Sequence, residues 1–152
     1  MSDFVPADFD VPRELITPQF RLEPLGPQHN LSDHAAWTSS IDHIRATPGF
    51  DVWKWPPADG MSLESNLGDL TRHAEDFVQR RGFTYTVLEP DGDVIGCLYI
   101  YPLRKDPSVT DVHSWVRADR AELDVALYEA VRDWLAADWP FTNVEYAVRS
   151  RT

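Results

Sequence analysis

Residues 83–101 read FTYTVLEPDGDVIGCLYIY, and this stretch decides the fold class. Two runs rich in β-branched and aromatic residues, 83–88 and 94–101, flank the short segment EPDGD at 89–93. A proline and an Asp-Gly pair between two apolar runs are typical of a turn, and Val, Ile, Tyr and Thr favour strands. The stretch therefore predicts an antiparallel hairpin.

The segments on either side of the hairpin supply the remaining elements. We expect the first helix to begin at Ser32, and the last to follow a capping box formed by Asp119 and Glu122. The resulting order β-α-α-β-β-β-α-β predicts an α+β fold, with a five-stranded, mostly antiparallel sheet and helices on its faces. Helical spacing of apolar residues is found in 32–44, 62–78 and 123–135, and strand-like patterns are found in 20–25, 109–117 and 143–149.

The length of 152 residues suits a single domain. Residues 1–19 contain four acidic residues and three prolines, which predicts an irregular N-terminal arm. We therefore expect one domain over 20–152, with the arm lying on it.

Charge and the lack of certain patterns exclude several classes of function. Fourteen basic against 25 acidic residues give a net charge of −11, which repels phosphate backbones and anionic lipids. We expect neither nucleic acid nor a membrane as a partner. No signal pattern is recognisable, and the single cysteine, Cys97, can form neither an internal disulfide nor a zinc site by itself. These features favour a cytoplasmic protein, and no residues show metal-ligand spacing.

The run from Phe20 to Ser150 resembles the GNAT superfamily of acetyl-CoA-dependent N-acetyltransferases. Three stretches carry the resemblance: FRLEPL at 20–25, the hairpin with its glycine at Gly96, and the strand-to-helix passage WVRADRAELDVALYEAV at 115–131. The resemblance implies a GNAT-like (acyl-CoA N-acyltransferase-like) domain that uses acetyl-CoA and acts on a small amine. The cofactor-binding residues that it implies are Trp115, Val116, Arg117 and Arg120.

The sequence also departs from this family. GNAT enzymes carry Q/R-x-x-G-x-G/A at the strand-to-helix passage, where backbone amides at a helix N-terminus hold the pyrophosphate. Asp119 here takes the Q/R position, and Glu122 and Asp124 take the places of the glycines. Carboxylates at a helix N-terminus suit the helix but repel a pyrophosphate. The helix and two strands that typically follow the fifth strand also have no counterpart.

Two hypotheses of function remain open on the sequence. The first is an N-acetyltransferase acting on a small amine. The second is a degenerate GNAT-fold module that binds a small molecule or a partner without catalysis and without CoA.

Asp111 and His113 are the candidate catalytic residues, because the resemblance implies that their strand, 109–117, faces the cleft that binds the acceptor. Alternation places Asp111, His113 and Trp115 on one face. An imidazole that a carboxylate orients can accept a proton from an amine. The alternative is a polar strand face that never meets a substrate.

Aromatic residues suggest a substrate pocket beside this strand. A loop with two tryptophans next to an aromatic strand face can line an apolar pocket with hydroxyl donors. The alternative is a core packed with aromatic residues. The candidate pocket residues are Trp53, Trp55, His73, Tyr85, Tyr99 and Tyr101.

The final strand predicts self-association. Its backbone groups need partners, and a second copy of the chain, the N-terminal arm or solvent can cover it. We expect a homodimer, since C2 dimers are the commonest closed assemblies.

Overall fold

The hairpin is the centre of the sheet in the computed structural model, which describes residues 3–149. Strands β3 (Phe83–Leu88) and β4 (Val94–Pro102) pair antiparallel, with Tyr85 opposite Leu98. Gly92 in the connecting loop has a φ of 102°, a conformation that glycine adopts at little cost. The predicted hairpin is confirmed.

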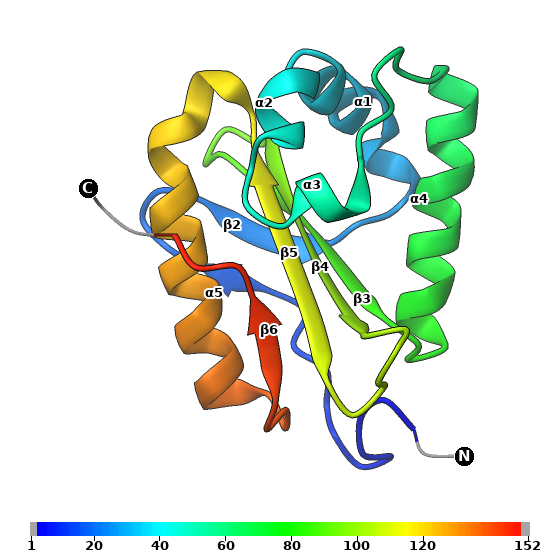
Figure 1. The fold of residues 1–152 in the computed structure, drawn as a ribbon, viewed down its shortest axis with the longest axis vertical. Helices are drawn as coiled ribbons and strands as arrows, with labels where there is room; N and C mark the ends of the chain where they lie inside the picture. Colours follow the sequence, from blue (N-terminus) through cyan, green and yellow to red (C-terminus); the bar gives the residue numbers. More distant parts are fainter. Residues whose placement is uncertain (1–2, 150–152) are drawn as a thin grey trace.

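The sheet has six strands in the order β1-β2-β3-β4-β5-β6, so the expected five were one too few (Figure 1). The additional strand lies in the N-terminal arm, where Leu15 pairs with Leu22. All neighbouring strands are antiparallel except β5 and β6, which are parallel. The mostly antiparallel α+β architecture is confirmed. The other strands are β1 (Leu15–Ile16), β2 (Arg21–Pro24), β5 (Thr110–Val116) and β6 (Val144–Tyr146).

Gly96 is required by the close pairing of β4 with β5. A Cβ at this position would collide with the backbone carbonyl oxygen of Trp115 on the neighbouring strand. Neither backbone can yield without breaking the ladder, so a residue without a side chain is needed here.

The first predicted helix is divided into shorter pieces. Its N-terminus also lies earlier than Ser32, since α1 begins at Asn30. The Ser39 hydroxyl donates to the Ala36 carbonyl, and Ser40 Oγ accepts a hydrogen bond from the amide of Ala118 across the fold. Serine side chains that bond to nearby backbone compete with the helix, which accounts for the break. The pieces are α1 (Asn30–Thr38) and α2 (Ile41–Arg45). Two further short helices lie outside the predicted range, η1 (Pro27–His29) before it and α3 (Phe50–Trp53) after it.

The two longer helices lie where periodicity predicts them. Helix α4 (Leu63–Val78) begins with Ser62, whose Oγ accepts a hydrogen bond from the Ser65 amide. Helix α5 (Asp124–Asp138) follows a 3-10 turn, η2 (Ala118–Leu123), that has no side-chain cap. The predicted capping box of Asp119 and Glu122 is therefore wrong.

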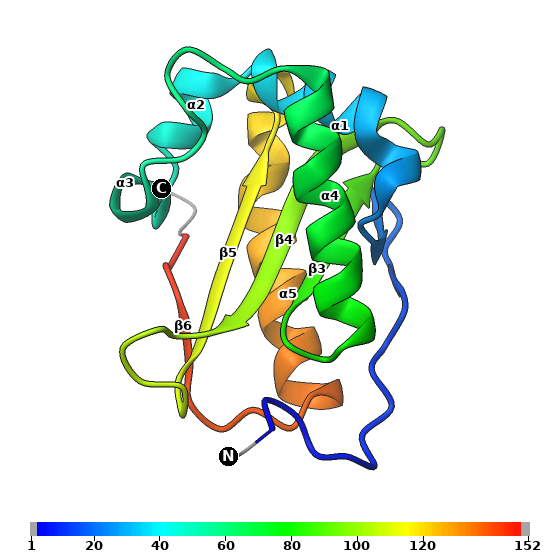
Figure 2. The same ribbon diagram turned by 90° about the vertical axis from the view of Figure 1, so that its right-hand side faces the viewer.

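The helices cover the two faces of the sheet unequally, as Figures 1 and 2 show together. Helix α5 lies against one face, while α1 to α4 lie on the other. The arm packs against the α5 side, where Val5 is buried and Phe4 stacks on Phe83 and Phe141. Among the described residues, no helix is long and apolar enough to cross a membrane.

Candidate functional site: a cavity with aromatic and acidic walls

A cavity of about 770 Å³ opens on the face of the sheet that α1 to α4 cover. Its walls come from α1, α3, α4, the ends of β4 and β5, β6, and the loop after β4. A volume of this size suits a small organic ligand. The residues that line it are Leu25, Asp33, Val52, Trp53, Trp55, Asn66, Asp69, Arg72, His73, Asp76, Tyr99, Tyr101, Pro102, Leu103, Arg104, Lys105, Asp111 and Glu145.

Aromatic rings form one wall of this cavity. Trp53 and Trp55 both pack against Tyr99, with ring centroids 5.4 and 6.3 Å apart. The Tyr99 hydroxyl accepts a hydrogen bond of 3.0 Å from Trp115 Nε1, and burial raises the pKa of this phenol. Tyr99 is therefore a neutral, fixed part of the wall. The structure brings together five of the six predicted pocket residues here, and Tyr85 is the exception.

Tyr85 lies on the opposite face of the sheet, so its assignment to the pocket is wrong. It pairs in register with Leu98, whereas Thr84 pairs with Tyr99. Directly opposed residues in an antiparallel pair share a face, which turns Tyr85 away from Tyr99. Its hydroxyl donates to the carbonyl of Pro12 in the N-terminal arm.

His73 and Tyr101 meet in a polar group that Asp76 completes. The Tyr101 hydroxyl donates to Asp76 Oδ2 at 3.0 Å and lies 2.9 Å from His73 Nδ1. Burial lowers the pKa of His73 to about 4, so the imidazole is neutral at neutral pH. A neutral imidazole, a phenol and a carboxylate thus line one part of the cavity.

Asp111 and His113 share one face of β5, as alternation predicts, and His113 Nε2 lies 2.9 Å from Asp111 Oδ1. Asp111 lines the cavity, whereas His113 does not. The His113 ring is covered by Trp53, with centroids 3.7 Å apart, and its Nδ1 is buried beside Gly49. The roles are thus reversed relative to the hypothesis in which the carboxylate orients a catalytic imidazole. The carboxylate of Asp111 faces the cavity, and the imidazole of His113 lies behind it.

Asp33 on α1 is a cavity residue that the sequence analysis did not identify. Its side chain is only 4% exposed, and its Oδ2 accepts a hydrogen bond of 3.1 Å from Asn66 Nδ2. Burial raises the pKa of this carboxyl to about 6. An acidic residue four positions before the apolar Trp37 was the available signal, because this spacing places both on the same helix face.

The other charges around the cavity are mostly paired or solvated. Five carboxylates face three basic side chains in the lining, so the cavity is acidic on balance. Asp69 pairs with Arg72, and Asp76 pairs with Arg81. Glu145 on β6 is exposed.

The turn between β5 and α5 is where the resemblance implies a pyrophosphate. The amides of Ala118, Arg120 and Asp124 already donate to Ser40 Oγ, to the Arg117 carbonyl and to the Ala121 carbonyl. Trp115 and Val116, the other implied cofactor residues, have buried side chains within the two cores.

The arginines of this turn are also engaged. Arg117 makes a two-pronged ion pair with Asp119, at 2.9 and 3.2 Å, and this hydrogen bonding holds the pKa of Asp119 below its usual range. Arg120 pairs with Glu89. Glu122 adds another exposed carboxylate. The engaged amides, the paired arginines and the carboxylates of Asp119 and Glu122 do not fit a diphosphate.

A buried arginine lies beside the first turn of α5. Arg149 donates to Asp124 Oδ2 at 3.1 Å and to the Ser114 carbonyl at 2.7 Å. Its guanidinium lies over the ring of Tyr146, whose hydroxyl is 2.6 Å from Ser114 Oγ. The Arg149 side chain therefore connects the segment after β6 to both β5 and the first turn of α5.

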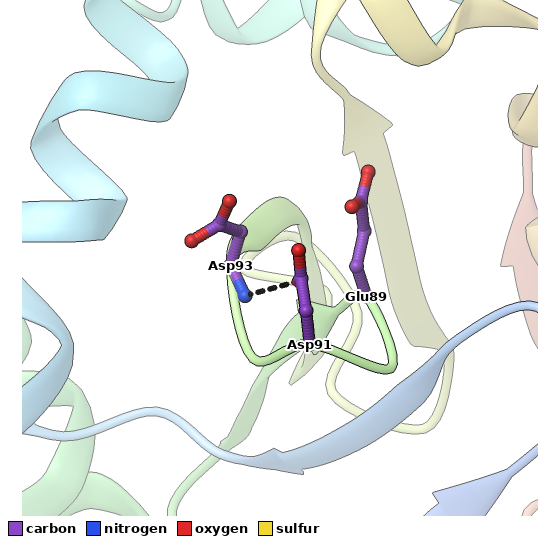
Figure 3. A group of neighbouring side chains, drawn as sticks. All are labelled: Glu89, Asp91 and Asp93. Carbon is purple, nitrogen blue, oxygen red and sulfur yellow. Dashed lines mark hydrogen bonds between the residues drawn. The ribbon is translucent and has the colours of Figure 1, made fainter.

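A second acidic group lies in the hairpin loop. The carboxylates of Glu89, Asp91 and Asp93 lie within 4.8 Å of one another (Figure 3). Asp91 Oδ1 accepts a hydrogen bond from the Asp93 amide, and Glu89 is paired with Arg120. Turn geometry and an ion pair account for this group, so it carries no assignment as a metal site.

Comparisons with known proteins show what kind of fold holds this cavity. No protein-family model and no curated protein matches the sequence. A putative ribosomal-protein-serine acetyltransferase from Vibrio cholerae matches with a TM-score of 0.67 at 12% identity, covering 88% of this chain and 72% of that chain. A probable GNAT-family acetyltransferase from Chromobacterium violaceum matches with a TM-score of 0.63 at 15% identity, covering 96% and 73%. A ribosomal L7/L12 alpha-N-protein acetyltransferase in complex with coenzyme A matches with a TM-score of 0.60 at 9% identity, covering 80% and 66%.

At these identities the matches establish the fold and nothing finer. The chain has the GNAT-type fold that the hairpin and the order of elements predicted.

Proposed function

We propose that this GNAT-fold domain binds a small organic amine in the cavity and does so without CoA. The observation that carries the proposal is the lining itself, in which an aromatic wall faces carboxylates that outnumber the basic side chains. A cation over an aromatic face gains about 0.5–2 kcal/mol, and nearby carboxylates add electrostatic attraction. Neutral or anionic ligands of the same shape gain neither.

Phenethylamine and its neutral analogue phenethyl alcohol test this proposal. We expect the amine to bind more tightly, because only the amine carries the charge that the carboxylates attract. Binding should change tryptophan fluorescence, since Trp53 and Trp55 line the cavity. Trp53→Ala should weaken binding of the amine by up to about tenfold, the loss of one cation–π contact.

Leu67→Ala is the matched control for Trp53→Ala. Leu67 is 41% exposed, close to the 37% of Trp53, but it does not line the cavity. Its removal should leave amine affinity unchanged. Equal binding of the amine and the alcohol would contradict the proposal.

Acetyl transfer to the bound amine is the second candidate function. The matched solved structures are acetyltransferases, and Asp111 faces the cavity, where a carboxylate can accept a proton from an amine. His113 would then act as a positioning residue behind Asp111. The acids and paired arginines of the turn before α5 argue against a bound acyl-CoA.

Calorimetric titration with acetyl-CoA at low salt separates the two candidates. We expect no micromolar binding, because the turn presents carboxylates where the diphosphate needs positive charge. Phenethylamine in the same cell serves as the positive control for a folded cavity. Micromolar binding of acetyl-CoA together with formation of N-acetylphenethylamine would establish the enzyme instead.

A further inference from the structure

The inference concerns Asp33 and rests on the proposed function, because it assigns the cavity a mode of regulation. Asp33 is the most deeply buried carboxylate in the lining, at 4% exposure. A buried carboxylate is stable when it is ionised beside a cation or when it is protonated, and it is costly otherwise. Its surroundings decide which of these states applies.

The one hydrogen-bond donor that the structure gives Asp33 comes from a neutral amide with a fixed orientation. Trp37 Nε1 can only donate, and it lies 3.0 Å from Asn66 Oδ1. Asn66 Nδ2 must therefore point the other way, towards Asn30 Oδ1 at 2.9 Å and Asp33 Oδ2 at 3.1 Å. The amide holds the carboxyl in place but carries no charge to neutralise it.

No arginine or lysine among the described residues forms an ion pair with Asp33. Arg72 lines the same cavity, but it pairs with Asp69. His29, which directly precedes α1, is in hydrogen-bond contact with Glu23 through its Nε2. The described side chains thus give Asp33 no fixed cation.

Further titratable groups face Asp33 from the elements packed around it. His34 on the same helix lies 2.7 Å from the Met61 carbonyl oxygen through its Nε2. The negative charge of Asp69 on α4 raises the pKa of Asp33, because like charges repel. The buried Cys97 and Tyr99 on β4 would repel an ionised Asp33 in the same way if they were charged. Burial raises the pKa values of Cys97 and Tyr99, which keeps both neutral over the acidic and neutral range.

We propose that Asp33, at mildly acidic pH, holds a proton in the ligand-free protein and releases it to solvent when the ammonium group of a ligand pairs with it. Proton and amine then compete for one carboxylate. The exchange balances: the carboxyl O–H bond breaks, the proton enters solvent, and an N–H···O⁻ hydrogen bond replaces it. Amine binding is therefore favoured at neutral pH and opposed at mildly acidic pH.

The raised pKa of Asp33, about 6, agrees with this geometry and sets the range of the effect. Only the ionised fraction of Asp33 attracts the amine. Between about pH 7 and about pH 5 that fraction falls about tenfold, and amine affinity should fall with it. His73 does not contribute over this range, because burial lowers its pKa to about 4.

The experiment is calorimetry of wild-type protein with phenethylamine across this pH range, in buffers of different ionisation enthalpy. At about pH 6 the binding of one amine should release about half a proton. Affinity should fall about tenfold from neutral to mildly acidic pH. Phenethyl alcohol should show neither effect, which separates Asp33 from the histidines elsewhere in the molecule.

Asp33→Asn and Asp69→Asn are the matched variants, since both residues line the cavity and only Asp69 has an arginine partner. Asp33→Asn should abolish the proton release and the pH dependence, while Asp69→Asn should keep both. An affinity for phenethylamine that is constant with pH would overturn this inference and leave the proposed function intact. Absence of any phenethylamine binding by the wild type would overturn the proposed function itself.

Discussion

Asp33→Asn is expected to stabilise the protein by about 3 kcal/mol at neutral pH. Asp33 is buried, and burial raises its pKa from 3.8 to about 6, so the folded state binds this proton more tightly than the unfolded state does. A group with a raised folded-state pKa favours folding at low pH and costs stability as pH rises through that pKa. The cost is complete above about pH 6, and asparagine at this position does not incur it.

Urea denaturation of wild type and variant at about pH 7 and about pH 4 measures this difference. The stabilisation should shrink towards zero at the lower pH, where Asp33 is protonated in the folded state. Asp69→Asn is the control, because Asp69 is partly solvated and its ion pair with Arg72 contributes less than about 1 kcal/mol. Equal stabilisation by Asp33→Asn at both values of pH would show that ionisation of the Asp33 carboxyl group is not what destabilises the wild type.

The burial of Asp33 was not predicted from the sequence. Asp33 directly follows Ser32, where the pattern of the sequence predicts the start of the helix. The helix begins at Asn30 instead, so Asp33 lies within its first turn, and both Asp33 and Trp37 are buried. An error of two residues in a helix boundary thus concealed the most buried carboxylate of the site.

Local patterns predicted the parts of the fold whose determinants are local. The hairpin of 83–101 depends on turn chemistry and strand propensity within one stretch, and it is confirmed. The break in the first helix depends on Ser40, whose hydroxyl bonds to Ala118 some 78 positions away. Contacts of that kind depend on the tertiary structure, and the spacing of apolar residues along the chain does not predict them.

The candidate site divides in the same way. Alternation alone placed Asp111 and His113 on one face of a strand, since it requires no knowledge of other segments. Which of the two reaches the cavity depends on Trp53, which covers His113 from α3. Tyr85 was misplaced because its face depends on the register between β3 and β4, and an irregularity beside Val87 and Leu88 shifts that register.

Arg149→Ala is expected to cost about 3–5 kcal/mol, the largest loss that we predict. Arg149 is 7% exposed, and its guanidinium donates to Asp124, to the Ser114 carbonyl and to the Ala147 carbonyl. Its removal leaves the partly buried carboxylate of Asp124 without its cation, while the buried Asp124 Oδ1 already has no hydrogen-bond partner. Breaking one side of a buried pair is costly because the other side stays buried.

Arg132→Ala is the matched control for this variant. Both guanidiniums lie 5.6 Å from a tyrosine ring centroid, but Arg132 is exposed and pairs with the exposed Asp133. Its loss should leave the free energy of unfolding nearly unchanged, because solvent screens an exposed ion pair. Adding Asp124→Asn to Arg149→Ala should recover part of the lost stability, because the uncompensated charge is then removed. If urea denaturation shows the two arginine variants to be equally stable, the guanidinium of Arg149 does not hold the C-terminal segment against β5 and α5.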